Sequence, residues 1–241
     1  MKSTIALVAF LRERPRAIAQ MRHIDTQEIT EGIYAIKTKG ANFFLVKNSD
    51  NKYIAIDAGG GNEAIIAAEL AKLNIGPEDI IATFLTHTDF DHIAALGLFK
   101  NATICLPQQE IQVIDGSAPR LPHLGKSRFN KTTLNHSYTA VEDNEELHFK
   151  DIIVRCIHTP GHTVGSMSFL INDTYLFVGD NLSLREGKVE LFNSIFNADD
   201  DVQKESLRRL AALPAGVQYI FTAHYGFSDN FQEAFEKFLS R

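Results

Sequence analysis

The sequence has no tryptophan, only two cysteines, and no uncharged apolar run of the roughly 18 residues that a helix needs to cross a bilayer. One possible disulfide cannot serve as the scaffold of a 241-residue chain, so Cys105 and Cys156, which both lie in apolar runs, are expected to be buried and reduced. Acidic residues outnumber basic ones by 30 to 24 and no basic run appears, which disfavours a nucleic-acid partner. We therefore expect a cytoplasmic protein that makes no contact with membranes.

The composition is that of an ordinary globular protein, with 44% apolar and 22% charged residues and no repeat or low-complexity segment. A single domain over residues 1–241 is favoured because no linker divides the chain. The apolar run at residues 5–11 has the outline of a signal peptide, but charged residues at 12–16 stand where a cleavage region is small and neutral. Residues 1–30 are therefore expected to form an N-terminal helix or arm, with a signal sequence as the alternative.

Short runs rich in β-branched and aromatic residues predict strands in both halves of the chain. They cover residues 33–37, 43–47, 53–56, 80–85, 146–149, 152–157, 166–171, 175–178 and 218–221. Apolar residues at helical spacing predict helices over residues 65–73, 93–99, 200–213 and 229–239. Residues 107–144 hold three of the seven prolines without periodicity and are predicted to form an irregular insert or lid. Its apolar residues Leu121, Leu124 and Phe129 either roof a groove or anchor the loop.

A dense group of metal-binding residue types directly follows the predicted strand 80–85. Within residues 86–92 stand His87, Asp89, Asp91 and His92. In an extended segment alternate side chains share a face, and a turn toward the next helix can bring His92 beside the other three. Imidazole nitrogens and carboxylate oxygens are the ligands that bind divalent cations at about 2.0 to 2.2 Å. The segment therefore predicts a metal site, and the alternative is a polar loop whose side chains cap the helix.

Three later segments strengthen the metal hypothesis. His162 follows Gly161, Asp180 follows Gly179, and His224 lies two residues before a glycine, each close after a predicted strand. Glycine beside a ligand-type side chain lets the backbone pack closely around an ion.

Taken together, these segments resemble the metallo-β-lactamase superfamily, whose pattern is His-x-His-x-Asp-His, then Gly-His, then an aspartate and a final histidine. The resemblance covers the chain from about Ile33 to Phe227, in the family's order. It implies an α+β fold, a four-layer αββα sandwich of two mainly antiparallel sheets with a dinuclear metal site at one sheet edge. It also implies a ligand set: His87, Asp89 and His162 for the first ion, Asp91, His92 and His224 for the second, Asp180 as the bridge, and Asp57 behind them, orienting a ligand histidine.

Asp89 departs from the family pattern, since most members have histidine there and the flavodiiron branch has glutamate. The carboxylates of Asp89, Asp91 and Asp180 carry a charge of −3, and with a bridging hydroxide they balance two divalent ions. An extra hard oxygen donor favours iron or manganese relative to zinc. The short aspartate side chain leaves three arrangements open: direct binding, binding through a water, or a weak first site.

Two adjacent cations lower the pKa of a shared water to about 7 and polarise the substrate oxygen, so the sequence predicts a metal-dependent hydrolase. In this hypothesis a metal-bound hydroxide attacks an ester, thioester, lactone, amide or phosphoester of a small molecule, and Asp91 or a metal-bound water handles the proton. Tyr225 would stabilise the oxyanion or simply pack beside the site. Arg185 and Lys188 would bind an anionic substrate or form a solvated hairpin.

Two functions of other classes remain open. The carboxylate at position 89 is reminiscent of flavodiiron proteins, and a diiron redox protein lacking the flavin domain would need a separate electron donor. The altered ligand set also permits a non-catalytic module that binds a metal or another ligand. Substrate identity is not encoded in any motif, since specificity depends on the insert and the groove loops.

Overall fold

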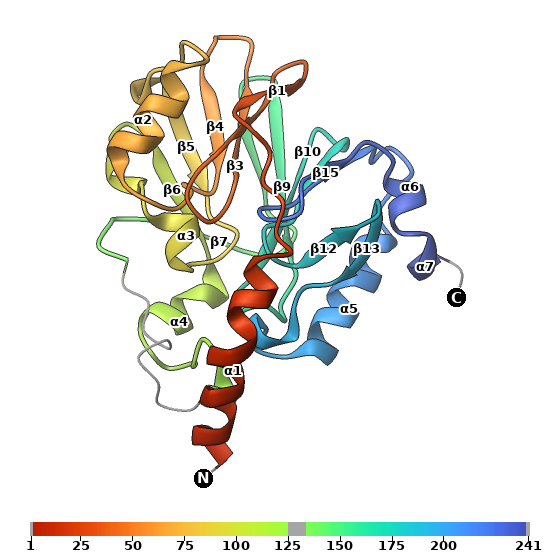
Figure 1. Cartoon of the computed structure of the whole chain (residues 1–241). Helices are drawn as coiled ribbons and strands as arrows, with labels where there is room; N and C mark the ends of the chain where they lie inside the picture. The colour runs from red at the N-terminus through yellow and green to blue at the C-terminus, as the bar shows by residue number, and fades with distance from the viewer. Residues whose placement is uncertain (1, 125–133, 240–241) are drawn as a thin grey trace.

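The computed structural model describes residues 2–124 and 134–239, which form two β-sheets packed face to face with helices on both outer sides (Figure 1). The first sheet has seven strands in chain order: β1 (Gln27–Thr30), β2 (Ile33–Ile36), β3 (Phe43–Lys47), β4 (Tyr53–Ile56), β5 (Ile80–Phe84), β6 (Thr103–Pro107) and β7 (Thr139–Val141). Pairing is antiparallel from β1 to β4 and parallel from β4 to β7.

The second sheet has the order β15-β14-β11-β10-β9-β8. Its strands are β8 (Glu146–Phe149), β9 (Ile152–His158), β10 (Met167–Ile171), β11 (Tyr175–Phe177), β14 (Tyr219–Phe221) and β15 (Phe227–Ser228). Only the pairing of β11 with β14 is parallel. A separate hairpin is formed by β12 (Leu182–Arg185) and β13 (Lys188–Leu191).

Seven α-helices complete the described chain: α1 (Lys2–Ile18), α2 (Glu63–Ala71), α3 (Phe90–Ile93), α4 (Ile111–Ile114), α5 (Asp200–Ala211), α6 (Phe231–Ala234) and α7 (Glu236–Leu239). Short 3₁₀ turns lie at Pro77–Asp79, Leu96–Leu98, Gln108–Glu110, Pro122–Leu124 and Ser194–Phe196. Figure 1 shows α1 extending below the two sheets, where it lies beside the turn Pro122–Leu124. None of the described helices has the length and apolar character required to cross a bilayer.

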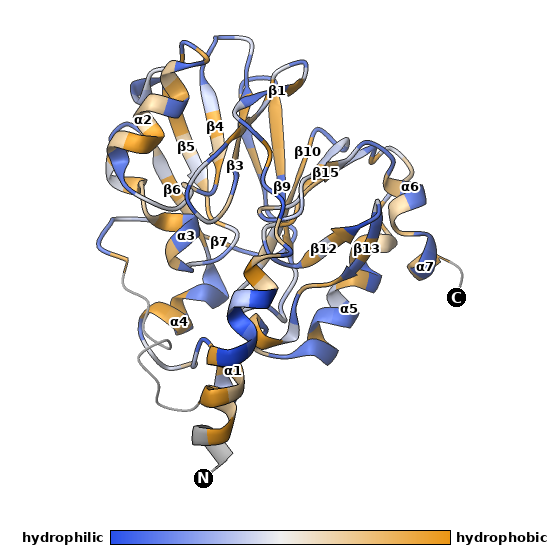
Figure 2. Ribbon diagram, in the orientation of Figure 1, coloured by the Kyte–Doolittle hydropathy of each residue, from blue (hydrophilic) through white to orange (hydrophobic). Residues whose placement is uncertain are grey.

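The alternation of side chains along the strands explains the layers. Phe44 and Val46 of β3 point into the core between the two sheets, whereas Phe43 and Leu45 point to the outer face. That outer face is covered by α2, and α5 covers the second sheet with residues such as Leu207. Figure 2 shows the hydrophobic colour concentrated on the strands and the hydrophilic colour along α5. Each large side chain buried in this way contributes about 1.5–3 kcal/mol, so the three apolar layers stabilise the sandwich.

The αββα arrangement confirms the expected fold class, with a larger parallel part in the first sheet than "mainly antiparallel" suggests. The insert at 107–144 contains α4 and β7 and is therefore less irregular than expected. The expected C-terminal helix is divided into α6 and α7. Leu121 and Leu124 pack in an apolar cluster against α1, and Phe129 lies outside the described residues.

Candidate metal centre

The structure brings all seven side chains that the sequence nominated as metal ligands into one cluster. Their ligand atoms form three overlapping groups, within each of which all atoms lie within 4.8 Å of one another: His87, Asp89 and His162; His87, His92 and Asp180; Asp91, His92 and His224. The residues come from the chain after β5, the connection between β9 and β10, and the chain after β11 and β14. Strands β4, β5, β11 and β14 present their carboxyl ends here, the usual position of ligand sites at such sheets.

Local geometry explains how residues that are close in sequence converge. Asp89 has an extended backbone (φ −66°, ψ 147°) and directly precedes α3. The amide of His92 donates to the carbonyl of Asp89 at 2.9 Å, so the first helical turn brings His92 back beside the preceding residues. Before Asp180, Gly179 adopts a positive φ of 55°, and a Cβ there would collide with the Thr86 side chain. Glycine is therefore required for the two segments to approach each other.

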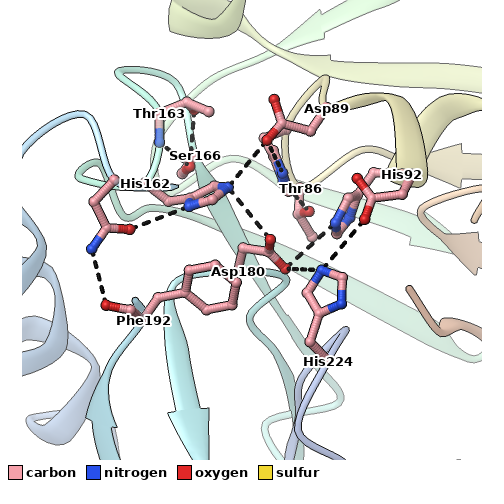
Figure 3. A network of polar contacts seen from close by, with 12 residues as sticks. Thr86, Asp89, His92, His162, Thr163, Ser166, Asp180, Phe192 and His224 are labelled. Carbon is pink, nitrogen blue, oxygen red and sulfur yellow. Dashed lines mark hydrogen bonds and ion pairs between the residues drawn. The ribbon is translucent and has the colours of Figure 1, made fainter. Parts of the chain in front are cut away.

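Asp180 lies at the middle of the cluster (Figure 3). Its Oδ1 is 3.4 Å from His92 Nε2 and 3.2 Å from His224 Nε2, and its Oδ2 is 3.4 Å from His162 Nε2. Ligands about 2.1 Å from a tetrahedral ion are separated by ~3.4 Å, so these spacings fit a cation. The buried Nε2 atoms of His87 and His92 and the Oδ1 of Asp180 have no hydrogen-bond partner among the described residues. Unpaired buried acceptors are costly, and an ion would satisfy them.

Asp57 lies behind His92, at the place where the sequence resemblance put an orienting carboxylate. Its Oδ2 is 2.8 Å from His92 Nδ1, and its Oδ1 accepts from the Thr86 amide at 2.7 Å. The imidazole thus donates through Nδ1 to Asp57, and its Nε2, the atom that would bind an ion, faces Asp180. Burial opposes protonation of His92, but the carboxylates of Asp180 and Asp57 raise its pKa well above the usual value.

Arg120, which no sequence motif nominated, lies against Asp89. Its Nε donates to Asp89 Oδ1 and its Nη2 to Asp89 Oδ2, both at 2.6 Å. The same guanidinium reaches His162, with Nη1 2.7 Å from the carbonyl oxygen and Nη2 2.7 Å from Nε2. Burial would raise the pKa of Asp89, but Arg120 holds it well below its ordinary value. Burial and the neighbouring guanidinium lower the pKa of His162 to about 4, so this imidazole is neutral.

On the other side of Asp180, no comparable cation is present among the described residues. His224 Nε2 is 3.6 Å from Asp91 Oδ2, and its Nδ1 is 3.5 Å from Nε2 of His23. His23 comes from the chain between α1 and β1 and was also missed by sequence reasoning. Burial opposes protonation of His224, but the carboxylates of Asp180 and Asp91 raise its pKa.

Glu110 is a third residue that sequence reasoning missed. Its buried carboxylate accepts from the amide and hydroxyl of Thr88 at 2.9 and 2.7 Å, and from the Thr163 hydroxyl at 2.6 Å. It thereby ties the loop that carries Asp89 to the loop that carries His162. Burial raises the pKa of this carboxyl, and the bonds from both threonines oppose the rise.

Five of the seven cluster residues, all except His87 and His92, form the floor of a pocket of about 570 Å³. The pocket is lined by Asp89, Asp91, Arg120, His162, Asp180 and His224 together with residues of the N-terminal helix and the loops, among them Phe10, Ile18, Met21, Leu121, Phe192 and Phe196. Leu121 of the insert, expected either to roof a groove or to anchor the loop, lines the pocket, and the wall formed by α1 was not expected. The apolar wall beside a polar floor is typical of small-molecule sites.

The three other nominated residues lie outside this lining, as far as the described residues show. Tyr225 packs its ring against Phe192 at 5.8 Å, and its buried hydroxyl has no hydrogen-bond partner among the described residues. Lys188 forms ion pairs with glutamates 233 and 236 at 3.2 and 3.0 Å. Arg185 donates to Gln20 Oε1 at 3.1 Å. Roles for Tyr225 in oxyanion stabilisation and for Arg185 and Lys188 in substrate binding stay predictions.

Comparison with known proteins adds independent information. A family model described as the metallo-beta-lactamase superfamily matches residues 37–224. A probable metallo-hydrolase of Methanocaldococcus jannaschii is 31% identical over 164 residues, which are 68% of this chain and 66% of the relative. A hydroxyacylglutathione hydrolase of Vibrio parahaemolyticus is 26% identical over 182 residues, 75% of this chain and 60% of the relative. The chain thus covers less than two thirds of either curated relative.

A solved structure shares the fold. The crystal structure of a metallo-beta-lactamase family protein from Thermus thermophilus superimposes with a TM-score of 0.67 and 20% sequence identity, covering 88% of this chain and 80% of that one. At this identity the likeness concerns the arrangement of sheets and helices and carries no information on substrate.

Proposed function

The chain belongs to the metallo-β-lactamase superfamily, and from that premise we propose that it is a metal-dependent hydrolase of a small-molecule ester, thioester or lactone. The observation that carries the proposal is the convergence of buried, unpaired polar atoms at Asp180, which lines the pocket, namely His87 Nε2, His92 Nε2 and Asp180 Oδ1. A polar cluster of this kind is costly to bury without a cation. Its position at the base of a pocket gives a substrate access to it.

The donor set suits a divalent ion of the first transition series, which accepts both imidazole and carboxylate. His92, His224, Asp91 and Asp180 would hold it. When bound, such an ion lowers the pKa of a coordinated water and polarises the oxygen of the scissile group. These residues therefore fit a divalent transition-metal ion. Asp91, Asp180 and His224 line the pocket, so a substrate can reach an ion bound to them.

The chain's own residues would perform the remaining steps. Asp57 fixes the orientation of His92 through the 2.8 Å contact with Nδ1, so Nε2 faces Asp180. Asp91 lines the pocket, and its side chain is 35% exposed, so it is positioned to accept the proton of the attacking water. The apolar wall of Phe10, Ile18 and Phe196 would exclude bulk water from the reacting group.

The pocket supports a compact substrate with an apolar part. Its volume of about 570 Å³ is within the ~300–1,000 Å³ range of small-molecule sites. Arg14 and Lys39 contribute positive charge to the lining, which would attract a carboxylate on the substrate. Both curated relatives are described as hydrolases, in keeping with this reaction class.

The test is a screen of esters, thioesters, lactones and phosphodiesters with metal content measured on the same sample. We expect turnover of at least one acyl substrate, its loss on chelation, and its return when Zn²⁺ or Mn²⁺ is added. His224→Gln should abolish turnover, and His148→Gln, in β8 and remote from the pocket lining, should leave it unchanged. A metal-replete protein that turns over none of these substrates, or one with bound iron and a reversible colour change only, would contradict the proposal.

A further inference from the structure

We propose that this centre holds a single divalent ion, on the side of Asp91 and His224, and that the Arg120 guanidinium takes the place of the second ion beside Asp89. The inference deepens the proposed function and rests on the metal binding that the function requires. It replaces the two-ion centre expected from the sequence resemblance, because the residues on the Asp89 side do not fit an ion.

The first reason is that Arg120 already uses the atoms that would bind an ion. Its Nη2 lies 2.6 Å from Asp89 Oδ2 and 2.7 Å from His162 Nε2. These two ligand atoms are themselves only 3.4 Å apart. An ion bound to both at about 2.1 Å would compete with Nη2 for the same lone pairs. The guanidinium and the ion would also repel each other as like charges in a buried site.

The second reason is the tautomer of His162. The Asn197 side-chain amide donates through Nδ2 to the Phe192 carbonyl at 3.2 Å and to Gln203 Oε1 at 2.9 Å. Its Oδ1 therefore faces His162 Nδ1 as an acceptor, at 3.3 Å. A neutral imidazole that donates through Nδ1 has one lone pair, on Nε2, and here it accepts from Arg120. None is left for a metal.

The third reason is the match between Asp89 and Arg120. The two oxygens of a carboxylate complement the parallel N–H groups of a guanidinium, a bidentate geometry that an imidazole cannot offer. Asp89 meets Arg120 in this fork, with both contacts at 2.6 Å. The aspartate that departs from the family pattern is thus explained as the partner of a buried cation, not as an alternative metal ligand.

The charge of the cluster agrees with one ion. Among the candidate ligands, the carboxylates of Asp89, Asp91 and Asp180 carry −3, and the guanidinium of Arg120, which contacts Asp89, brings the total for these four groups to −2. One divalent ion balances this charge, whereas two would leave an excess of +2 before any hydroxide is added. On the Asp91 side, no lysine or arginine of the described residues pairs with the carboxylate, and His92 Nε2 remains without a partner.

The experiment counts ions per chain by elemental analysis and by titration of the chelated, metal-free protein with Co²⁺, followed by visible absorption. We expect the wild type to saturate at one equivalent. Arg120→Met, which frees the Asp89 carboxylate and His162 Nε2, should bind a second equivalent. Arg120→Lys keeps the positive charge and should remain at one. Two equivalents in the wild type, or a methionine variant that still stops at one, would overturn the inference.

A matched pair of variants locates the single ion. His224→Gln should lose it, whereas His162→Gln should retain it, because the Nε2 of His162 already accepts from Arg120. The opposite pattern would place the ion beside Asp89 and Arg120 and would overturn the assignment. If Arg120→Met does not fold because Asp89 is left unpaired, Asp89→His/Arg120→Met removes the stranded charge and should also bind two ions.

The two proposals fail in different ways. A wild type with one ion and no turnover would refute the hydrolase and leave the one-ion centre standing. A wild type with two ions and ester turnover would do the reverse. The number of bound ions is read without any substrate, so the count does not depend on finding the right one.

Discussion

The two sides of Asp180 contain the same residue types and have different environments. On one side Asp89 and His162 are engaged by the Arg120 guanidinium through contacts of 2.6–2.7 Å. On the other side Asp91 and His224 are 3.6 Å apart and face the pocket. The number of histidines and aspartates in a cluster therefore does not by itself give the number of metal ions that bind there. One buried cation from elsewhere in the chain can occupy two of the seven candidate ligands.

The largest expected effect is on stability, and it comes from breaking the ion pair between Arg120 and Asp89. Arg120→Met should destabilise the metal-free protein by about 3 kcal/mol, because it strands the carboxylate of Asp89, and breaking a buried ion pair typically costs ~3–5 kcal/mol. The measurement is urea unfolding at pH 7 in the presence of a chelator. Arg185→Met, which removes an exposed partner of Glu190, should change stability by less than about 1 kcal/mol. Equal losses in the two variants would mean that the Arg120 pair has no special role.

The ion site at Asp91 and His224 can be tested through Asp57, which orients the ligand His92. Asp57→Asn should weaken the affinity for the ion about 10- to 100-fold, the usual result of removing a carboxylate that orients a ligand histidine. The two oxygens of Asp57 accept from Thr86 and from His92 Nδ1, and an amide supplies only one acceptor oxygen. Competition with a chelating dye measures the affinity.

A control for Asp57 lies on the surface. Asp50→Asn removes an exposed carboxylate that pairs with Lys150 and lies before the amino end of β4, opposite the carboxyl ends that carry the cluster, and it should leave the affinity for the ion unchanged. If Asp57→Asn binds the ion as tightly as the wild type, the orientation of His92 does not depend on this carboxylate.

The same difference separates the site residues that the sequence predicted from those that it did not. The segment 86–92 follows a strand and carries its ligands in one turn, so local spacing was sufficient to nominate them. Arg120 lies 31 residues after Asp89, in an insert without periodicity, and its role depends on a contact between loops. His23 is 201 residues from His224. No local pattern predicts such pairings, because they are set by how the loops pack.

The same distinction holds for the fold. Apolar runs rich in β-branched and aromatic residues between polar breaks, such as Phe43–Lys47 and Tyr53–Ile56, were predicted as strands with their observed bounds. The hairpin of β12 and β13 was expected only as a solvated charged hairpin, the alternative to substrate binding by Arg185 and Lys188, and its two strands were not delimited. Its stability comes from packing Val189 and Leu182 against α5 and the second sheet, which the local sequence does not reveal.

A smaller effect concerns the pocket wall above the open side. Ile18 of α1 lines the pocket and is 44% exposed, so Ile18→Ala should lower kcat/KM about fivefold by removing roughly 1 kcal/mol of apolar contact with the substrate. Ile5 lies on the same helix, is 67% exposed and is outside the pocket lining. Ile5→Ala should therefore leave kcat/KM unchanged. A loss of the same size in both variants would point to the helix as a whole and not to the wall of the pocket.

The smallest effect is expected far from either side. Lys188 was nominated from sequence as a residue that binds an anionic substrate, but its Nζ lies 3.2 Å from Glu233 and 3.0 Å from Glu236, and pairing with them raises its pKa. Both contacts are at the surface, where ion pairs contribute little because water and salt screen them. Lys188→Ala should therefore change neither KM nor the number of bound ions. Steady-state kinetics with the best substrate of the screen decides the matter: a several-fold rise in KM would restore Lys188 as a substrate-binding residue and extend the open side of the centre beyond the pocket described above.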